Sequence, residues 1–149
     1  MPAPMRIYLD NCCLNRPFDD QSNLRVRLES EAVKVILQLC EQGQWDLVSS
    51  TVAKFEIANT PDEIRRKNLE LISSIASAII RIDSAISLRA KEFEAKGMQA
   101  FDALHVACAE SGSDVFLTVD DKLRKRALSI DTLRIPVSSP LKWLEEVLS

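Results

Sequence analysis

Four acidic side chains follow predicted strands or lie near the start of predicted helices, although they are spread over most of the chain: Asp10, Glu56, Asp102 and Asp120. Parallel strands open their carboxyl ends on one edge of a sheet, so carboxylates that follow different strands converge there. Two carboxylates about 4 Å apart repel each other by about 4 kcal/mol at an effective dielectric near 20. Protonation reduces this repulsion, but a cation that prefers oxygen ligands offsets it more directly. The pattern therefore predicts a Mg²⁺ or Mn²⁺ site.

Such a site favours hydrolysis of a phosphodiester. Two divalent cations about 3.5–4 Å apart activate an attacking water and stabilise the leaving oxygen. Other chemistries find little support, because the sequence contains no G-x-x-x-x-G-K-[ST], G-x-G-x-x-G, G-x-S-x-G or H-E-x-x-H motif and has 3 glycines in total. A nuclease is the reaction class that these residues predict, and enzymes of ATP or NAD are disfavoured.

Each carboxylate also has a simpler explanation. Asp10 and Asp120 could cap turns, Asp102 could stabilise the start of a helix, and Glu56 could lie on a solvated face. These explanations do not account for the apolar neighbours of Glu56 and Asp102, in the sequences Phe55-Glu56-Ile57 and Phe101-Asp102-Ala103. We therefore expect the four to act together.

Two neighbouring residues leave alternatives open. Asp121 follows Asp120 directly and could face the cleft in its place, although acidic residues also favour a helix start for electrostatic reasons. We favour Asp120. His105 lies about one helical turn beyond Asp102, and a packing or supporting role is expected for it rather than that of a general base.

Short apolar runs alternate with helical patterns along the chain. Strands are predicted over 5–9, 46–49, 78–82, 114–118 and 133–137, and residues 14–23 are expected to form a loop. Helices are predicted over 24–42, from 50 or 51 through 57, and over 60–77, 84–96, 100–111, 121–129 and 139–148. This alternation predicts a three-layer α/β/α sandwich with a central parallel sheet of four to five strands.

Length and composition are those of one globular domain spanning residues 1–149, with 46% hydrophobic and 28% charged content. Four cysteines lack a C-x-x-C or Cys/His ligand spacing, which suits a reducing cytosol. The sequence shows neither a signal-peptide pattern nor a long apolar run, so a cytoplasmic protein that does not enter a membrane is expected.

The net charge of −3 argues against a protein that coats nucleic acid through bulk positive charge. Basic residues nevertheless cluster in Arg65-Arg66-Lys67 and in 122–126. Lys122, Arg124 and Lys125 follow the acidic site directly, so they could bind the phosphates of RNA, although a solvated helix face is the simpler interpretation. Four aromatic residues could stack on bases but are expected in the core: Trp45, Phe55, Phe116 and Trp143.

At these residues the chain resembles the PIN-domain family of ribonucleases, particularly the compact toxins of bacterial VapC-type toxin–antitoxin pairs. The resemblance spans nearly the whole length. It rests on four motifs in order: IYLDN at 7–11, STVAKFE at 50–56, FDALHVA at 101–107 and FLTVD at 116–120. Each motif alone is weak, whereas four in the same order are specific.

By this resemblance, Asp10 and Asp102 are the principal metal ligands, Glu56 and Asp120 complete the acidic pocket directly or through water, and Thr118 helps to orient it. The family implies divalent-metal cleavage of single-stranded RNA, commonly of a structured RNA in the toxins. It also implies frequent homodimers and a small antitoxin protein as partner.

One motif departs from the family. Asn11-Cys12-Cys13 follows Asp10, where the family more often has a small hydroxyl residue and then asparagine. Asn11 is expected to substitute in part, and Cys12 and Cys13 to be small buried apolar side chains rather than ligands. The departure supports the alternative of a catalytically silent PIN-like module that binds RNA or a partner protein. A receiver domain also gathers aspartates but lacks support here, since no acidic pair follows the first strand.

Overall fold

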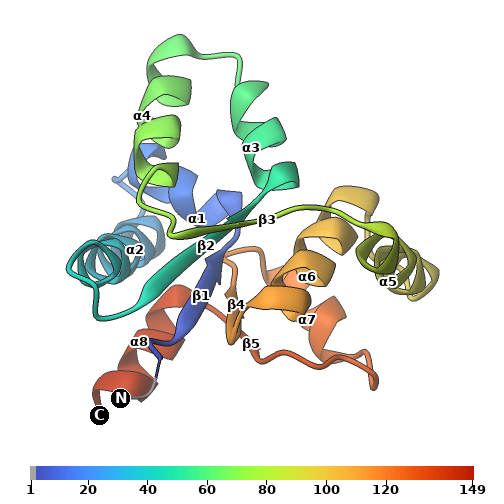
Figure 1. Cartoon of the computed structure of the whole chain (residues 1–149). Helices are drawn as coiled ribbons and strands as arrows, with labels where there is room; N and C mark the ends of the chain where they lie inside the picture. The colour runs from blue at the N-terminus through green and yellow to red at the C-terminus, as the bar shows by residue number, and fades with distance from the viewer. Residues whose placement is uncertain (1–2) are drawn as a thin grey trace.

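The computed structural model describes residues 3–149 as a parallel five-stranded sheet covered by helices on both faces (Figure 1). Each strand pairs in parallel with its neighbours, in the order β3-β2-β1-β4-β5. The strands are β1 (Arg6–Leu9), β2 (Asp46–Ser50), β3 (Ala78–Ile80), β4 (Val115–Leu117) and β5 (Val137–Ser138). The predicted α/β/α sandwich with a parallel sheet is confirmed.

The pleat of the central strand sends its side chains into two cores. Ile7 and Leu9 face one core, and Tyr8 faces the other. The first core is covered by α2 (Leu24–Glu41), α4 (Glu63–Ser73) and α8 (Pro140–Leu148). The second is covered by α5 (Ser84–Ala95), α6 (Ala100–Gly112) and α7 (Asp121–Leu128). Near-continuous apolar strands are the expected consequence of burial on both faces.

Residues predicted as a loop contain two short helices. α1 (Asn11–Asn15) follows β1 directly, and the 3-10 helix η1 (Arg16–Phe18) carries Pro17 near its start. The prediction of a loop over 14–23 was wrong for 14–18. A helix this short has little periodic signal, and proline is compatible with its first turn.

β5 and α4 depart most from their predicted bounds. The last strand is Val137–Ser138 rather than 133–137, because Pro136 has no N–H to donate and the chain turns where Leu133 N donates to Ile130 O. α4 ends at Ser73 rather than at 77. There Ser74 Oγ donates to Leu71 O, and the chain leaves the helix so that β3 can pair with β2.

The remaining helix, α3 (Thr51–Ala58), follows β2 without a loop. Its N-cap is Ser50, whose Oγ accepts from Ala53 N at 3.1 Å. This settles the choice between Ser50 and Thr51. Over residues 3–149, none of the helices combines the length and apolar character that crossing a bilayer requires.

Three of the four aromatic residues expected in the core are buried there. Trp45 and Trp143 pack edge to face with their ring centroids 4.9 Å apart, and Phe116 is fully buried. The prediction was wrong for Phe55, which is 57% exposed and stacks on Phe101 of α6. Both phenylalanines lie on the outer side of helices whose opposite sides are already packed.

Candidate metal centre

The strand order explains where the acidic residues meet. Connections from β1 to β2 and from β2 to β3 cover one face of the sheet, whereas those from β3 to β4 and from β4 to β5 cover the other. The change of face falls between β1 and β4, which are hydrogen-bonded neighbours. Ligand sites of such sheets lie at this switch point, beyond the carboxyl ends of the strands. Asp10 follows β1 here, and Thr118 and Asp120 follow β4.

Asp10 is fixed at the centre of this edge. Its side chain is buried, with 7% of its surface exposed, and its backbone N donates to Leu117 O at 2.9 Å. Oδ2 of Asp10 accepts from Thr118 Oγ1 at 2.9 Å and from Cys12 Sγ at 3.2 Å. Although Asp10 precedes α1, its carboxylate makes no capping hydrogen bond to that helix. The carboxylate is therefore held by the side chains of Thr118 and Cys12 rather than by backbone N–H groups of the helix.

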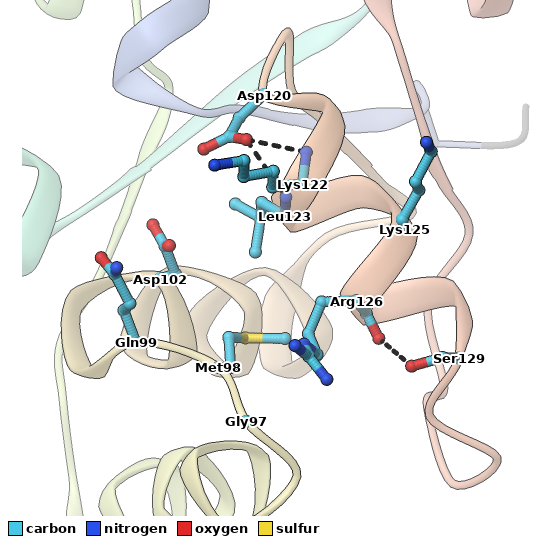
Figure 2. Close-up of a pocket in the computed structure, with 10 residues that line it drawn as sticks. All are labelled: Gly97, Met98, Gln99, Asp102, Asp120, Lys122, Leu123, Lys125, Arg126 and Ser129. Atoms are coloured by element: carbon cyan, nitrogen blue, oxygen red, sulfur yellow. Dashed lines mark hydrogen bonds between the residues drawn. The ribbon is translucent and has the colours of Figure 1, made fainter.

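Asp102 and Asp120 face a common cavity from α6 and from the start of α7 (Figure 2). Burial, followed by the negative charges of Asp10 and Asp120, raises the pKa of Asp102 to about 6. Asp120 is the N-cap of α7, and its Oδ1 accepts from Lys122 N at 3.0 Å and Leu123 N at 3.1 Å. Asp102 and Asp120 therefore face the same cavity, and the charge of Asp10 also acts on Asp102.

Glu56 approaches the same edge from α3 and is tied to a buried chain of hydrogen bonds. Its Oε1 contacts His105 Nε2. The other ring nitrogen, His105 Nδ1, lies 2.7 Å from Tyr8 Oη, which lies 2.6 Å from Ser50 Oγ. Burial lowers the pKa of His105, but the hydrogen bond with Glu56 and the charges of Asp10, Glu56 and Asp102 outweigh it, so the pKa is raised. His105 thus supports Glu56 from within the core.

Asn11 offers the centre a further oxygen. Its Nδ2 donates to Ala53 O and to Glu56 Oε1, both at 3.2 Å. Its Oδ1 is buried and has no hydrogen-bond partner among residues 3–149. A buried carbonyl oxygen without a partner is costly, and a cation or a water bound to one would satisfy it.

The side chains at this centre are not gathered tightly around one point. Among residues 3–149, no group of three or more His, Cys, Asp and Glu side chains has the arrangement of a metal site. Glu56 is turned to His105 and Asp120 to the start of α7. The donors themselves are oxygen atoms of carboxylates and an amide, which fit Mg²⁺ or Mn²⁺ rather than a softer metal.

The neighbouring Cys12 and Cys13 differ in burial. Cys13 is fully buried against Leu117 O, as predicted. The prediction of burial was wrong for Cys12, which is half-buried and lies 3.2 Å from Asp10 Oδ2 and 3.3 Å from Thr118 Oγ1. Cys12 therefore occupies the surroundings of Asp10, where its S–H donates to the carboxylate.

Asp121 points away from the cavity. Its Oδ1 accepts from Arg25 Nη2 at 2.6 Å and also from Arg124 Nη2. These two hydrogen bonds, from Arg25 first, hold the pKa of Asp121 well below its usual range. Arg124 also donates to Thr118 O at 3.3 Å and does not line the cavity, whereas Lys122 and Lys125 do. Arg126 lines it as well, although it was not among the basic residues predicted to bind phosphates.

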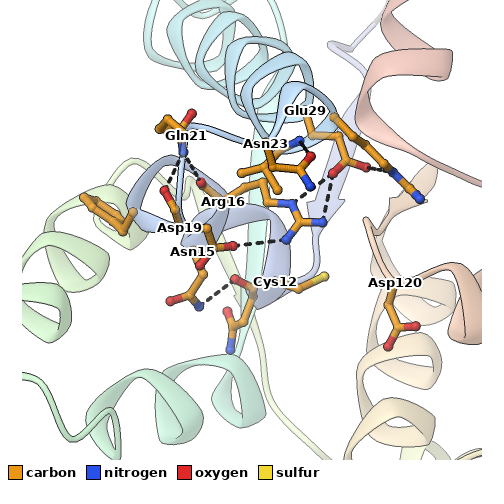
Figure 3. Close-up of polar contacts among 12 residues, drawn as sticks. Cys12, Asn15, Arg16, Asp19, Gln21, Asn23, Glu29 and Asp120 are labelled. Carbon is orange, nitrogen blue, oxygen red and sulfur yellow. Dashed lines mark hydrogen bonds and ion pairs between the residues drawn. The ribbon is translucent and has the colours of Figure 1, made fainter.

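A network of ion pairs holds the chain that follows Asp10 (Figure 3). Arg16 Nε donates to the buried Glu29 Oε1 at 2.9 Å, and Arg25 pairs with the other oxygen of Glu29. Arg65 of α4 donates to Phe18 O at 2.6 Å and to Asp19 Oδ1 at 3.2 Å. Arg65 is thus a structural residue, which a run of three basic residues could not reveal.

The fold and its acidic edge define a class of protein. Its members are parallel α/β sandwiches with carboxylates at the switch point, between the strands where the crossover connections pass from one face of the sheet to the other. A family model for the PIN domain matches residues 7–128, and the chain belongs to this family, whose members are generally nucleases. All four carboxylates lie within the matched residues.

Two solved structures have a similar fold. The chain is similar to the crystal structure of FitAcB from Neisseria gonorrhoeae, with 17% identity over 90% of this chain and 97% of that chain and a TM-score of 0.58. It is also similar to VapBC2 from Rickettsia felis bound to a DNA fragment from their promoter, with 14% identity over 91% and 98% of the two chains and a TM-score of 0.60. No curated protein sequence matches the chain.

Proposed function

We propose that this protein is a divalent-metal-dependent endoribonuclease and the toxin of a prokaryotic toxin–antitoxin pair. The observation that carries the proposal is that Asp102 and Asp120 line one cavity at the edge of the sheet where Asp10 follows β1. Burial, followed by the charges of Asp10 and Asp120, raises the pKa of Asp102 to about 6. Carboxylates that disturb one another in this way repel unless a cation is bound. Membership of the PIN domain family supports hydrolysis of nucleic acid as the reaction.

Asp10, Asp102, Glu56 and Asp120 would hold Mg²⁺ or Mn²⁺, with Asn11 Oδ1 close by. When bound, such a cation supplies a concentrated positive charge that polarises the phosphate and makes water a better nucleophile. Thr118 donates to Oδ2 of Asp10 and accepts from the backbone N of Asp120 at 3.1 Å, so it joins the carboxylate of Asp10 to the start of α7. His105 holds Oε1 of Glu56, which leaves Oε2 to bind the cation or to take a proton from water.

The proposed function includes an RNA substrate, an antitoxin protein as partner and a homodimer. Lys122 and Lys125 line the cavity beside the carboxylates and would hold RNA phosphates. The likeness to FitAcB and VapBC2 supports a small antitoxin protein as partner. The exposed, stacked pair of Phe55 and Phe101 is a surface that a second copy of the chain would cover in a homodimer. A cytoplasmic location suits the four free cysteines.

Cleavage of labelled structured RNAs tests this proposal. The wild type should cut RNA with Mg²⁺ or Mn²⁺ and not with chelator. Asp102→Asn should lower the cleavage rate by at least about a thousandfold, because the change removes a metal ligand. Asp121→Asn is the matched control, since Asp121 pairs with Arg25 and Arg124 away from the cavity. Equal cleavage by wild type and Asp102→Asn would refute the proposed site.

A catalytically silent module that binds RNA or a partner protein is the second candidate. It is favoured by the contact of Glu56 with His105 and by the half-buried Cys12 next to Asp10, both of which occupy carboxylate oxygens. Such a module would bind RNA equally well with metal and with chelator and would leave it intact. Cleavage that depends on metal excludes it.

A further inference from the structure

A cavity of about 560 Å³ extends from the acidic centre along the groove between α7 and the turn that joins α5 to α6. Asp102 and Asp120 lie at one end, and Arg126 lies toward the other (Figure 2). This volume falls within the range of small-ligand pockets and is far larger than a metal ion needs. The carboxylates therefore account for only part of the cavity.

Arg126 lies against Gly97 in the turn before α6. The glycine has a φ of +99°, and a Cβ at this position would lie 3.0 Å from Cζ and Nη1 of Arg126. The guanidinium thus lies directly against backbone. Within residues 3–149, Arg126 forms no ion pair, whereas Arg124, two residues earlier, is bound by Asp121. The donors of Arg126 remain available for an anion in the cavity.

The rest of the lining suits a base. Met98 and Leu123 are buried, with 5% and 4% of their surfaces exposed, and present apolar groups to the cavity. Gln99 is the N-cap of α6 but makes no side-chain capping bond. Its amide is therefore not used by the helix, and an amide can donate to and accept from the edge of a base.

We infer that this cavity holds the nucleotide next to the scissile phosphate of the RNA. The base packs against Met98 and Leu123 with its edge at Gln99, and the next phosphate along the strand meets Arg126. With a divalent cation bound at the carboxylate end, the scissile phosphate lies there, and Arg126 holds the chain beyond it. This inference rests on the proposed ribonuclease function and adds the residues that select and hold its substrate.

Binding of a short labelled single-stranded RNA of mixed sequence, with chelator present to prevent cleavage, tests the role of Arg126. Arg126→Gln should raise the Kd about tenfold and reduce the slope of log K against log salt by about 1, because one phosphate contact is lost. Arg134→Gln is the matched control, since Arg134 is an exposed arginine just before β5 that does not line the cavity. Its Kd should equal that of the wild type.

The same binding and cleavage measurements distinguish a wrong role for Arg126 from a wrong assignment as a ribonuclease. RNA binding and cleavage by Arg126→Gln equal to those of the wild type would overturn the inference and leave the nuclease intact. A wild type that neither binds nor cuts RNA would overturn both.

Cleavage of a randomised RNA tests Gln99. The bases beside the cut made by the wild type should be biased at one position, and Gln99→Ala should lose that bias while it still cuts. A bias that persists in Gln99→Ala, or no bias in the wild type, would overturn this role of Gln99. The melting temperature of each variant shows whether it is folded.

Discussion

The raised pKa of Asp102 makes the stability of the metal-free protein depend on pH. In an unfolded chain its pKa is about 3.9, whereas burial and the charges of Asp10 and Asp120 raise it to about 6 in the folded protein. Between these values the folded state binds more protons than the unfolded state. The free energy of unfolding without metal therefore falls as the pH rises from about 4 to about 6, and it stays lower above that range.

Replacing Asp102 should consequently stabilise the metal-free protein. We expect Asp102→Asn to raise the free energy of unfolding at pH 7 by about 1 kcal/mol, once solvent screening of a half-buried group is allowed for. Urea denaturation in chelator measures the change. Asp131→Asn, which removes the same charge from an exposed position, should have no effect. A loss of stability in Asp102→Asn would contradict the raised pKa of Asp102.

Metal binding should depend on the same proton. A cation binds the ionised carboxylate, so the proton that Asp102 keeps below about pH 6 competes with it. The affinity for Mn²⁺ should rise between pH 5 and pH 7 and then level off, as measured by calorimetric titration. An affinity that is constant over this range would exclude Asp102 as a ligand.

Tyr8 links the core to Glu56 through His105. Tyr8→Phe removes a fully buried hydroxyl that contacts Ser50 Oγ and His105 Nδ1. It should lower the free energy of unfolding by about 1–3 kcal/mol, because both groups lose a partner away from water. Cleavage should also slow, since His105 no longer holds Glu56 in one position. Ser111→Ala, which removes the hydroxyl of an exposed serine that donates to Cys108 O, should cost less in urea denaturation and leave cleavage unchanged.

At the scale of elements, an ion pair with the buried Glu29 of α2 attaches the segment α1–η1 to α2. Glu29 of α2 is 4% exposed and is paired with Arg16 of η1. Arg16→Met should lower the free energy of unfolding by about 3 kcal/mol, because it leaves Glu29 with only the exposed Arg25 as partner. Arg16→Met combined with Glu29→Met should recover most of this loss in urea denaturation. Equal losses in the single and double variants would show that the ion pair itself, rather than the unpaired charge, determines stability.

Elements with a strong periodic or apolar signal could be predicted from the sequence, and those shaped by single residues could not. β1 and β4 are short apolar runs that end just before Asp10 and Thr118, and both were predicted within a few residues. β5 was misplaced because Pro136 interrupts an apolar run that otherwise has the character of a strand. α1 was missed because it is 5 residues long and its preceding residue, Asp10, forms no cap.

In the site too, features with a local sequence signal could be predicted, whereas contacts between distant residues could not. The placement of Asp10, Asp102 and Asp120 at one edge of the sheet could be predicted, because each stands next to a strand end or a helix start. The contact between Glu56 and His105 could not, since residues 49 positions apart meet only when α3 packs on α6. The difference between Arg124 and Arg126 depends on which side of α7 faces the cavity, and a run of basic residues does not reveal it.

At the scale of the molecule, strand order decides where chemistry can occur. Periodicity predicts a parallel sheet but not the order β3-β2-β1-β4-β5, and only this order makes β1 and β4 neighbours at the switch point. The solved structures of similar fold share 17% and 14% of their residues with this chain. A fold retained at such low identity is specified mainly by its pattern of apolar strands and helices, which leaves the cavity lining free to vary.

The central claim is that carboxylates from four separate parts of the fold form a divalent-cation site. Calorimetric titration of the purified protein with Mn²⁺ at pH 7 tests it most directly, with Asp10→Asn and Asp121→Asn measured beside the wild type. We predict saturable binding in the wild type and Asp121→Asn, and its loss in Asp10→Asn. No saturable binding in the wild type, or equal binding in Asp10→Asn, would contradict the claim.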